Sequence, residues 1–305
     1  MEVRMKLLYT ILNLMTFIAI GFLLKKIKLF SKETAQELNS FVFKVAFPLN
    51  IITSFYKVNL AEVINFSFFL YITFTFFLSF CLALAISHLL HKDGLNRAVT
   101  TVAVYRGNFI IMGFPILESL LGYASLIYAG IILAISQVFY NITTAWVYEK
   151  ATLAKADYKK LFFNIFKNPM LLGVLIGILI NLTNFNLYFL ENPFRTIGKT
   201  ATTFGLIVLG HGLSFDFDKN NLKNTIIVAF AKLLILPAIA FFASNLFNLA
   251  PIEKSTAIIL FACPTAIVSY TFAKNYKADT KLAQNYVIFT TFLFMFTIYL
   301  VLKIF

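Results

Sequence analysis

Long apolar stretches separated by short polar loops account for most of the chain. A transmembrane helix needs about 20 predominantly apolar residues, and ten stretches meet this requirement. Their approximate limits are 7–24, 36–55, 63–90, 96–120, 123–147, 169–185, 188–212, 223–247, 253–275 and 280–304. The pattern predicts an all-α polytopic membrane protein with ten transmembrane helices.

Composition supports this prediction and excludes a soluble domain. Of the 305 residues, 60% are hydrophobic and 13% charged, whereas soluble domains are about half apolar. The net charge is +13, and the charged residues lie mostly in short loops between spans, so we expect no nucleic-acid partner. Cys81 and Cys263 both fall inside spans, and we interpret them as small buried hydrophobic residues and not as metal ligands.

The distribution of positive charge predicts orientation. Most of the 26 Lys and Arg residues lie in the loops that follow the odd-numbered spans. Because cytoplasmic loops carry an excess of Lys and Arg, we expect these loops in the cytoplasm and both termini outside the cell membrane.

The longest polar stretch, 148–168, divides the spans into two groups of five. We therefore predict a first five-helix repeat over 1–149, a cytoplasmic linker over 150–168 and a second repeat over 169–305. An odd number of spans in each half inverts the second repeat relative to the first. The linker is either an amphipathic helix on the inner leaflet or a plain basic connection.

Two prolines interrupt apolar spans at corresponding places in the halves. Pro115 lies in span 4 and Pro264 in span 9, which is the fourth span of its half. Proline removes a helical hydrogen bond, and a freed backbone group in hydrocarbon must be satisfied by protein or by a water-filled cavity. Paired broken helices of this kind are typical of the binding site of a secondary transporter.

Several motifs, in order along nearly the whole chain, resemble the auxin efflux carrier family of membrane transport proteins. They are Leu38–Val42 and Ala46–Leu49 in span 2, Arg106–Phe109 and Gly113–Pro115 in span 4, Asn168–Pro169 at the start of span 6, Leu209–Gly210 and Gly212–Leu213 in span 7, Lys232–Pro237 in span 8, and Pro264–Tyr270 and Ala273–Tyr276 in span 9. Order and spacing carry this resemblance more than any single motif.

The resemblance implies two inverted five-helix repeats in which broken helices 4 and 9 cross. Helices 1, 2, 6 and 7 would form a scaffold domain, and helices 3–5 and 8–10 a transport domain that moves like an elevator. It also implies transport of a small organic anion and a homodimer formed through the scaffold. The long hydrophilic loop of the large plant carriers is absent, so nothing indicates auxin itself.

The candidate binding residues surround the two prolines. The half-helices that begin after Pro115 and Pro264 would direct free amides and positive dipole ends at an anion. Asn108 could bind a carboxylate or cap unwound backbone, and the resemblance implies that an asparagine here contacts substrate. Thr265 is expected to have the same dual role, and Ser269 is a weaker candidate.

Charged side chains within spans indicate function by default. Arg106 could pair with a carboxylate or lie at the cytoplasmic mouth. Lys44 could tune anion selectivity or snorkel to the interface. Lys232 fits a structural role, balancing the dipoles at the crossing, better than substrate contact. Asn50, near Pro48, is a candidate contact from the scaffold side.

Two further residues could couple transport to an ion. Glu118 could carry a proton, bind a cation or pair with a lysine, and His211 could titrate near neutral pH. Coupling to H⁺, to Na⁺ or to membrane potential alone stays open, and we expect no bound cofactor. A non-transporting receptor or scaffold is the main alternative, whereas an intramembrane enzyme lacks a supporting motif such as HExxH or GxSxG.

Overall fold

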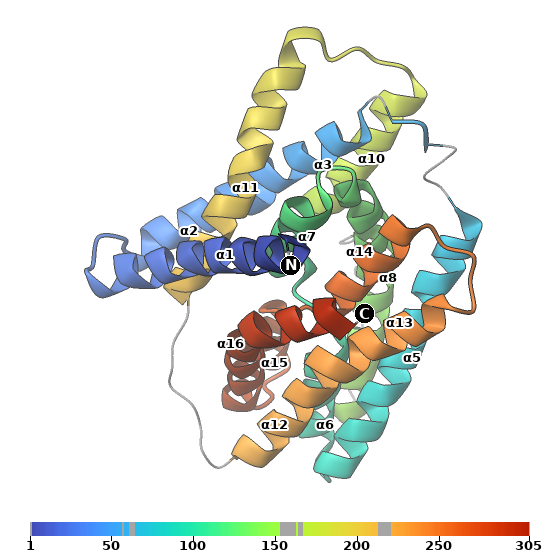
Figure 1. Cartoon of the computed structure of the whole chain (residues 1–305). Helices are drawn as coiled ribbons and strands as arrows, with labels where there is room; N and C mark the ends of the chain where they lie inside the picture. The colour runs from blue at the N-terminus through green and yellow to red at the C-terminus, as the bar shows by residue number, and fades with distance from the viewer. Residues whose placement is uncertain are drawn as a thin grey trace. The chain divides into compact units, whose positions relative to one another are not determined.

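The computed structural model describes residues 2–56, 58–60, 65–152, 163, 167–212 and 221–304. The secondary structure of this part of the chain is helical, apart from one isolated antiparallel bridge between Gly107 and Thr265 (Figure 1). The predicted all-helical class is therefore confirmed for this part of the chain. Most of the predicted linker over 150–168 lies outside the described residues, and α8 (Ser125–Thr152) extends to its beginning.

Five helical stretches among the described residues are long and apolar enough to cross a membrane, and each overlaps a predicted span. They are Lys32–Phe55, Phe66–Leu90, Ser125–Thr152, Leu222–Ser244 and Thr280–Ile304. Spans 4 and 9 each consist of two shorter helices, as expected of interrupted spans. The ten-helix count and the inverted repeat stay predictions.

The chain forms two compact units, each assembled from separate parts of the sequence. Unit 1 contains Met1–Asn65, Ile110–Ala134 and Phe163–Leu213, and unit 2 contains Phe66–Phe109, Ile135–Phe162 and Ser214–Phe305. Each unit is described by itself below.

Unit 1 is built around α11, which packs against the first helices of the chain. Its helices are α1 (Glu2–Lys26), α2 (Lys32–Phe41), α3 (Phe47–Phe55), α7 (Phe114–Leu121), α10 (Pro169–Leu182) and α11 (Glu191–Gly212), with the short 3₁₀ turn η3 (Tyr188–Leu190) before α11. Helices α1 and α11 touch backbone to backbone. A Cβ atom on Gly210 would lie 1.9 Å from the Ile18 carbonyl oxygen, and one on Gly21 would lie 1.9 Å from that of Ile207. Small residues allow this approach, as is common between helices in membranes.

Unit 2 contains the longest apolar helices and an aromatic core around Phe76. Its helices are α5 (Phe66–Leu90), α6 (Gly94–Tyr105), the second part of α8, α12 (Leu222–Phe230), α13 (Leu236–Ser244), α14 (Pro251–Ala262), α15 (Val268–Asn275) and α16 (Thr280–Ile304). The Phe76 ring packs on those of Phe139, Tyr140 and Phe261 at centroid distances of 5.0 to 5.5 Å. Cys263 is buried as predicted, but Cys81 is exposed, because it lies on the outer face of α5.

Three prolines follow π-helical turns. Proline cannot donate a helical hydrogen bond and clashes with the carbonyl four residues before it, and a wider π turn moves that carbonyl aside. The turns η1 (Val42–Ala46), η2 (Phe109–Gly113) and η5 (Ala231–Ile235) precede Pro48, Pro115 and Pro237, each of which is the second residue of the next α-helix. Pro48 and Pro237 therefore lie within continuous helical stretches.

Candidate functional site

Two interrupted helices meet in unit 2 through their backbones. Helix α6 ends at Tyr105 and α14 at Ala262, and short non-helical stretches follow each. These stretches run antiparallel: the Asn108 amide donates to the Pro264 carbonyl at 2.8 Å, and the Ala266 amide donates to the Arg106 carbonyl at 3.0 Å. Each non-helical stretch thus pairs with backbone groups that the other leaves without a helical hydrogen bond. Such pairing is necessary because unpaired backbone polar groups are very unfavourable in the hydrocarbon core of a membrane. We call this pair of stretches the bridge.

The first interruption does not lie where the sequence predicted it. We expected the break at Pro115, but the helix is continuous from Phe109 to Leu121, and the non-helical residues are Arg106–Asn108. The π turn before Pro115 absorbs the missing hydrogen bond, so this proline does not open the helix. The second interruption does lie at Pro264, within the non-helical stretch that follows Ala262.

Hydroxyl groups from neighbouring helices cap the remaining free backbone of the bridge. The Tyr140 hydroxyl, on α8, accepts from the Gly107 amide at 3.2 Å and donates to the Tyr105 carbonyl at 3.2 Å. The Thr290 hydroxyl, on α16, accepts from the Thr265 amide at 3.1 Å. Each break is therefore capped by the long helix that follows it in its half of the chain.

Thr265 uses its side chain within the protein. Its hydroxyl donates to the Ala103 carbonyl at 2.7 Å, and the residue is fully buried. Of the two roles expected for Thr265, the structure contains the backbone-capping one.

Asn108 and Ser269 retain hydrogen-bonding capacity. Both are buried, with 7% and 2% of their surface exposed. Within the described residues, the Asn108 side-chain nitrogen and the Ser269 hydroxyl have no hydrogen-bond partner. Because buried polar groups in proteins are nearly always paired, these two groups are available to a ligand.

Arg106 is a buried cation enclosed by aromatic rings. Its guanidinium lies 5.0 Å from the Tyr140 ring centre and 5.1 Å from that of Phe272, and it donates to the Thr144 hydroxyl at 3.3 Å. Cation–π contacts offset part of the cost of burying the charge. No carboxylate among the described residues forms an ion pair with it.

Lys232 is a second buried cation beside the bridge. It belongs to the π turn η5 and is fully buried. Its Nζ atom occupies the space next to Gly107, 3.4 Å from where a Cβ atom on that glycine would stand. In the part of the chain that the structure describes, Nζ has no hydrogen-bond partner. Burying an unpaired charge is costly, so an anion near the bridge would be stabilised by both cations.

Unit 1 holds a separate polar cluster that includes Asn50 and Glu118. The Thr202 hydroxyl donates to the Glu118 carboxylate at 3.0 Å, and the Lys199 charge also acts on it. The Asn50 amide lies close enough to interact with this carboxylate, although neither of its side-chain atoms completes a hydrogen bond within the described residues. Among the described residues, Glu118 therefore accepts a hydrogen bond from a neutral hydroxyl and forms no direct ion pair with a lysine.

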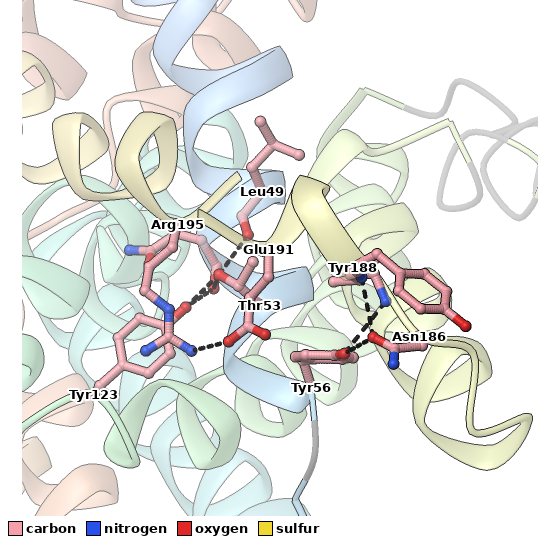
Figure 2. A network of polar contacts seen from close by, with 10 residues as sticks. Leu49, Thr53, Tyr56, Tyr123, Asn186, Tyr188, Glu191 and Arg195 are labelled. Atoms are coloured by element: carbon pink, nitrogen blue, oxygen red, sulfur yellow. Dashed lines mark hydrogen bonds and ion pairs between the residues drawn. The ribbon is translucent and has the colours of Figure 1, made fainter. Parts of the chain in front are cut away.

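A hydroxyl network extends this cluster along α3 (Figure 2). Thr53 bonds Tyr123, whose hydroxyl donates to the Asn50 carbonyl at 3.0 Å. Arg195 lies over the Tyr123 ring at 5.1 Å and pairs with Glu191 at 3.3 Å. The network holds the backbone of Asn50 and leaves its amide group free.

Two of the predicted residues stand apart from these groups. The Lys44 side chain is exposed and does not share the buried face of Asn50. His211 is mostly buried, and its Nε2 atom lies 3.1 Å from the Phe30 carbonyl. This is a local contact within unit 1, between the end of α11 and the turn that follows α1.

Sequence reasoning missed the capping and enclosing residues Thr144, Phe272 and Thr290. Thr144 and Thr290 lie in long apolar helices and Phe272 in the short helix α15, and no local signal separates them from their neighbours. A threonine in such a helix usually bonds its own backbone, and Thr290 does so too, donating to the Tyr286 carbonyl at 2.6 Å.

Comparison with known proteins agrees with the motifs. The family described as "Membrane transport protein" matches residues 7–302. The chain therefore belongs to this family, which confirms the resemblance found in the sequence.

Two curated archaeal relatives cover nearly the whole chain. An "Uncharacterized transporter" of Methanothermobacter thermautotrophicus is 23% identical over 298 residues, which cover 93% of each protein. A second relative described in the same words, from Methanocaldococcus jannaschii, is 24% identical over 291 residues, covering 92% of this chain and 93% of its own. The chain is thus a membrane protein of a transporter family, and the match to this family extends over residues 7–302.

Proposed function

We propose that this protein carries a small organic anion, a mono- or dicarboxylate, across the cell membrane by alternating access. The observation that supports this proposal is the pair of buried cations, Arg106 and Lys232, that flank the bridge without an ion-pair partner among the described residues. A carboxylate bound there would offset the cost of both charges.

Each residue near the bridge has a distinct role in this proposal. Asn108 and Ser269 donate hydrogen bonds to the carboxylate, and Arg106 pairs with it, in a charge-assisted interaction stronger than a neutral one. Lys232, whose Nζ atom lies next to Gly107, attracts the carboxylate electrostatically. Pro264 and Thr265 shape and hold the second stretch of the bridge.

The remaining elements of the proposal derive from the charge distribution and the family resemblance. They are ten spans in two inverted repeats, both termini outside, an elevator-like movement of helices 3–5 and 8–10 against helices 1, 2, 6 and 7, and a homodimer formed through the latter. Coupling to H⁺ or Na⁺ would use Glu118, with Asn50 beside it, and a uniporter would need neither. We propose no enzymatic activity.

Replacing Asn108 by alanine tests the site. A hydrogen bond to a charged group contributes about 1.5–3 kcal/mol, so uptake of the transported anion into proteoliposomes should fall roughly 10- to 100-fold. The measurement is initial uptake of labelled mono- and dicarboxylates by the wild type and Asn108→Ala.

Asn275→Ala is the matched control, because this asparagine lies at the end of α15 in the same unit and is exposed. It should transport like the wild type. Equal uptake by Asn108→Ala would refute the assigned site, and uptake of no organic anion by the wild type would refute the carrier proposal.

A further inference from the structure

A cavity lies between α5, the first turns of α6 and the end of α8 in unit 2. Its volume is about 150 Å³, and three potential cations line it: His88, Arg97 and Lys150. The bridge follows the opposite end of α6, so this cavity is distinct from the proposed substrate site. We call it the basic pocket.

The cations of the basic pocket are held in place but not neutralised. Arg97 donates through Nε to the His91 carbonyl at 2.7 Å, which leaves its two terminal nitrogens for another partner. The Nζ atom of Lys150 lies 5.2 Å from the Trp146 ring centre. Neither cation forms an ion pair with a carboxylate in the described ranges.

Two buried hydroxyl groups complete the lining. Thr101 donates to the Ser87 hydroxyl at 2.9 Å, and both residues are almost fully buried. The first turn of α6 contributes less, because the Asp93 carboxylate already accepts from the Asn96 amide there. The Ser87 hydroxyl donates in turn to the Leu84 carbonyl at 2.9 Å, so both hydroxyls are occupied within the protein. The donors left for a ligand are the terminal nitrogens of Arg97 and the Lys150 ammonium, which suit an anion with several acceptor oxygens, such as a phosphate group.

An apolar stripe on α8 leads directly to the basic pocket. Val138, Ile142 and Trp146 are spaced four residues apart, as is Lys150 after them, and the three apolar side chains are 41–49% exposed. Residues at this spacing share one face of a helix. The stripe thus ends at a cation, which matches an amphiphile with an apolar chain and a negative head.

We propose that the basic pocket binds the phosphate of an anionic phospholipid whose acyl chains lie along the exposed stripe of α8. The charge distribution predicts that the loops bearing Arg97 and Lys150 face the cytoplasm, where anionic lipids are enriched. A soluble phosphate would use the same cations but would leave the adjacent apolar stripe without a role. The site does not depend on the proposed transport function.

Lipid binding by the purified full-length protein tests this proposal. In mixed micelles, phosphatidylglycerol should raise the melting temperature and stay bound in native mass spectrometry, whereas phosphatidylcholine should do neither. A direct hydrogen bond between a charged donor and the phosphate strengthens binding about tenfold or more, so Lys150→Gln should weaken phosphatidylglycerol binding by that factor and Lys150→Glu by more. Lys150 is exposed, so neither variant should disturb the fold.

Lys92→Gln is the control, because Lys92 is exposed in the loop before α6 and does not line the pocket. It should bind phosphatidylglycerol like the wild type. Equal weakening by Lys92→Gln would show a general surface-charge effect and overturn the proposal. Equal stabilisation by phosphatidylcholine, or by soluble glycerol phosphate at the same concentration, would overturn it as well.

Discussion

Replacing Gly210 by valine should abolish the folded protein or lower its melting temperature severely. The first added atom would lie 1.9 Å from the Ile18 carbonyl oxygen, so α1 and α11 would have to separate along their whole contact. Overpacking usually costs about 1–3 kcal/mol and sometimes more. Here the clash is with backbone atoms, so it cannot be relieved by rotating a neighbouring side chain. We expect a loss above about 3 kcal/mol, measured as yield and melting temperature in detergent.

Gly205→Ala is the matched control on the same helix. A Cβ atom there would contact the Phe47 ring and Val42 at ordinary distances, about 3.6 Å. Alanine favours a helix over glycine by up to about 1 kcal/mol, so this variant should be as stable as the wild type or more so. A Gly210→Val protein with an unchanged melting temperature would contradict the close crossing of α1 and α11.

Replacing Lys232 by methionine should stabilise the protein and impair its function. Methionine is similar in length and carries no charge, and exchanging buried ions for apolar residues is often neutral or stabilising by about 1–4 kcal/mol. Under the proposed function, the same change removes half of the positive charge beside the bridge. We therefore expect a melting temperature equal to or above that of the wild type, together with uptake reduced at least tenfold.

Lys223→Met provides the comparison, because Lys223 is exposed near the start of α12 in the same unit. It should change neither property. If Lys232→Met lost stability instead, Lys232 would serve to hold the bridge together, as the sequence first indicated. Wild-type uptake by a stable Lys232→Met protein would remove Lys232 from the proposed site.

Local sequence located the interrupted spans but not the mechanism of interruption. Four prolines lie in apolar spans, and the sequence predicted breaks at two of them, Pro115 and Pro264, but not at Pro48 or Pro237. Three of them follow a π turn and continue a helix, and Pro264 alone among the four lies in an open stretch. The difference arises because Arg106–Asn108 and the segment around Pro264 find backbone partners in each other, which no local pattern reveals.

The candidate site was predicted in part. Arg106 and Lys232 were singled out because charged groups in apolar spans are costly, and Asn108 because of its amide near the break and the family resemblance. The structure buries all three around the bridge. Thr265 was also singled out, but its hydroxyl is occupied by the Ala103 carbonyl. Which hydroxyl is occupied and which is free depends on neighbours that are distant in sequence, such as Ala103.

Hydropathy alone indicates a helical membrane protein, because segments that cross a bilayer must be long, apolar and helical whatever their tertiary packing. The order of the motifs adds the transporter family. The paired prolines likewise indicated that spans 4 and 9 are broken. Only the tertiary structure placed the first break at Arg106–Asn108, paired it with the second and left two buried cations beside it without an ion-pair partner among the described residues. These features depend on which backbone and side-chain groups meet across unit 2, and composition and periodicity carry no information about those pairings.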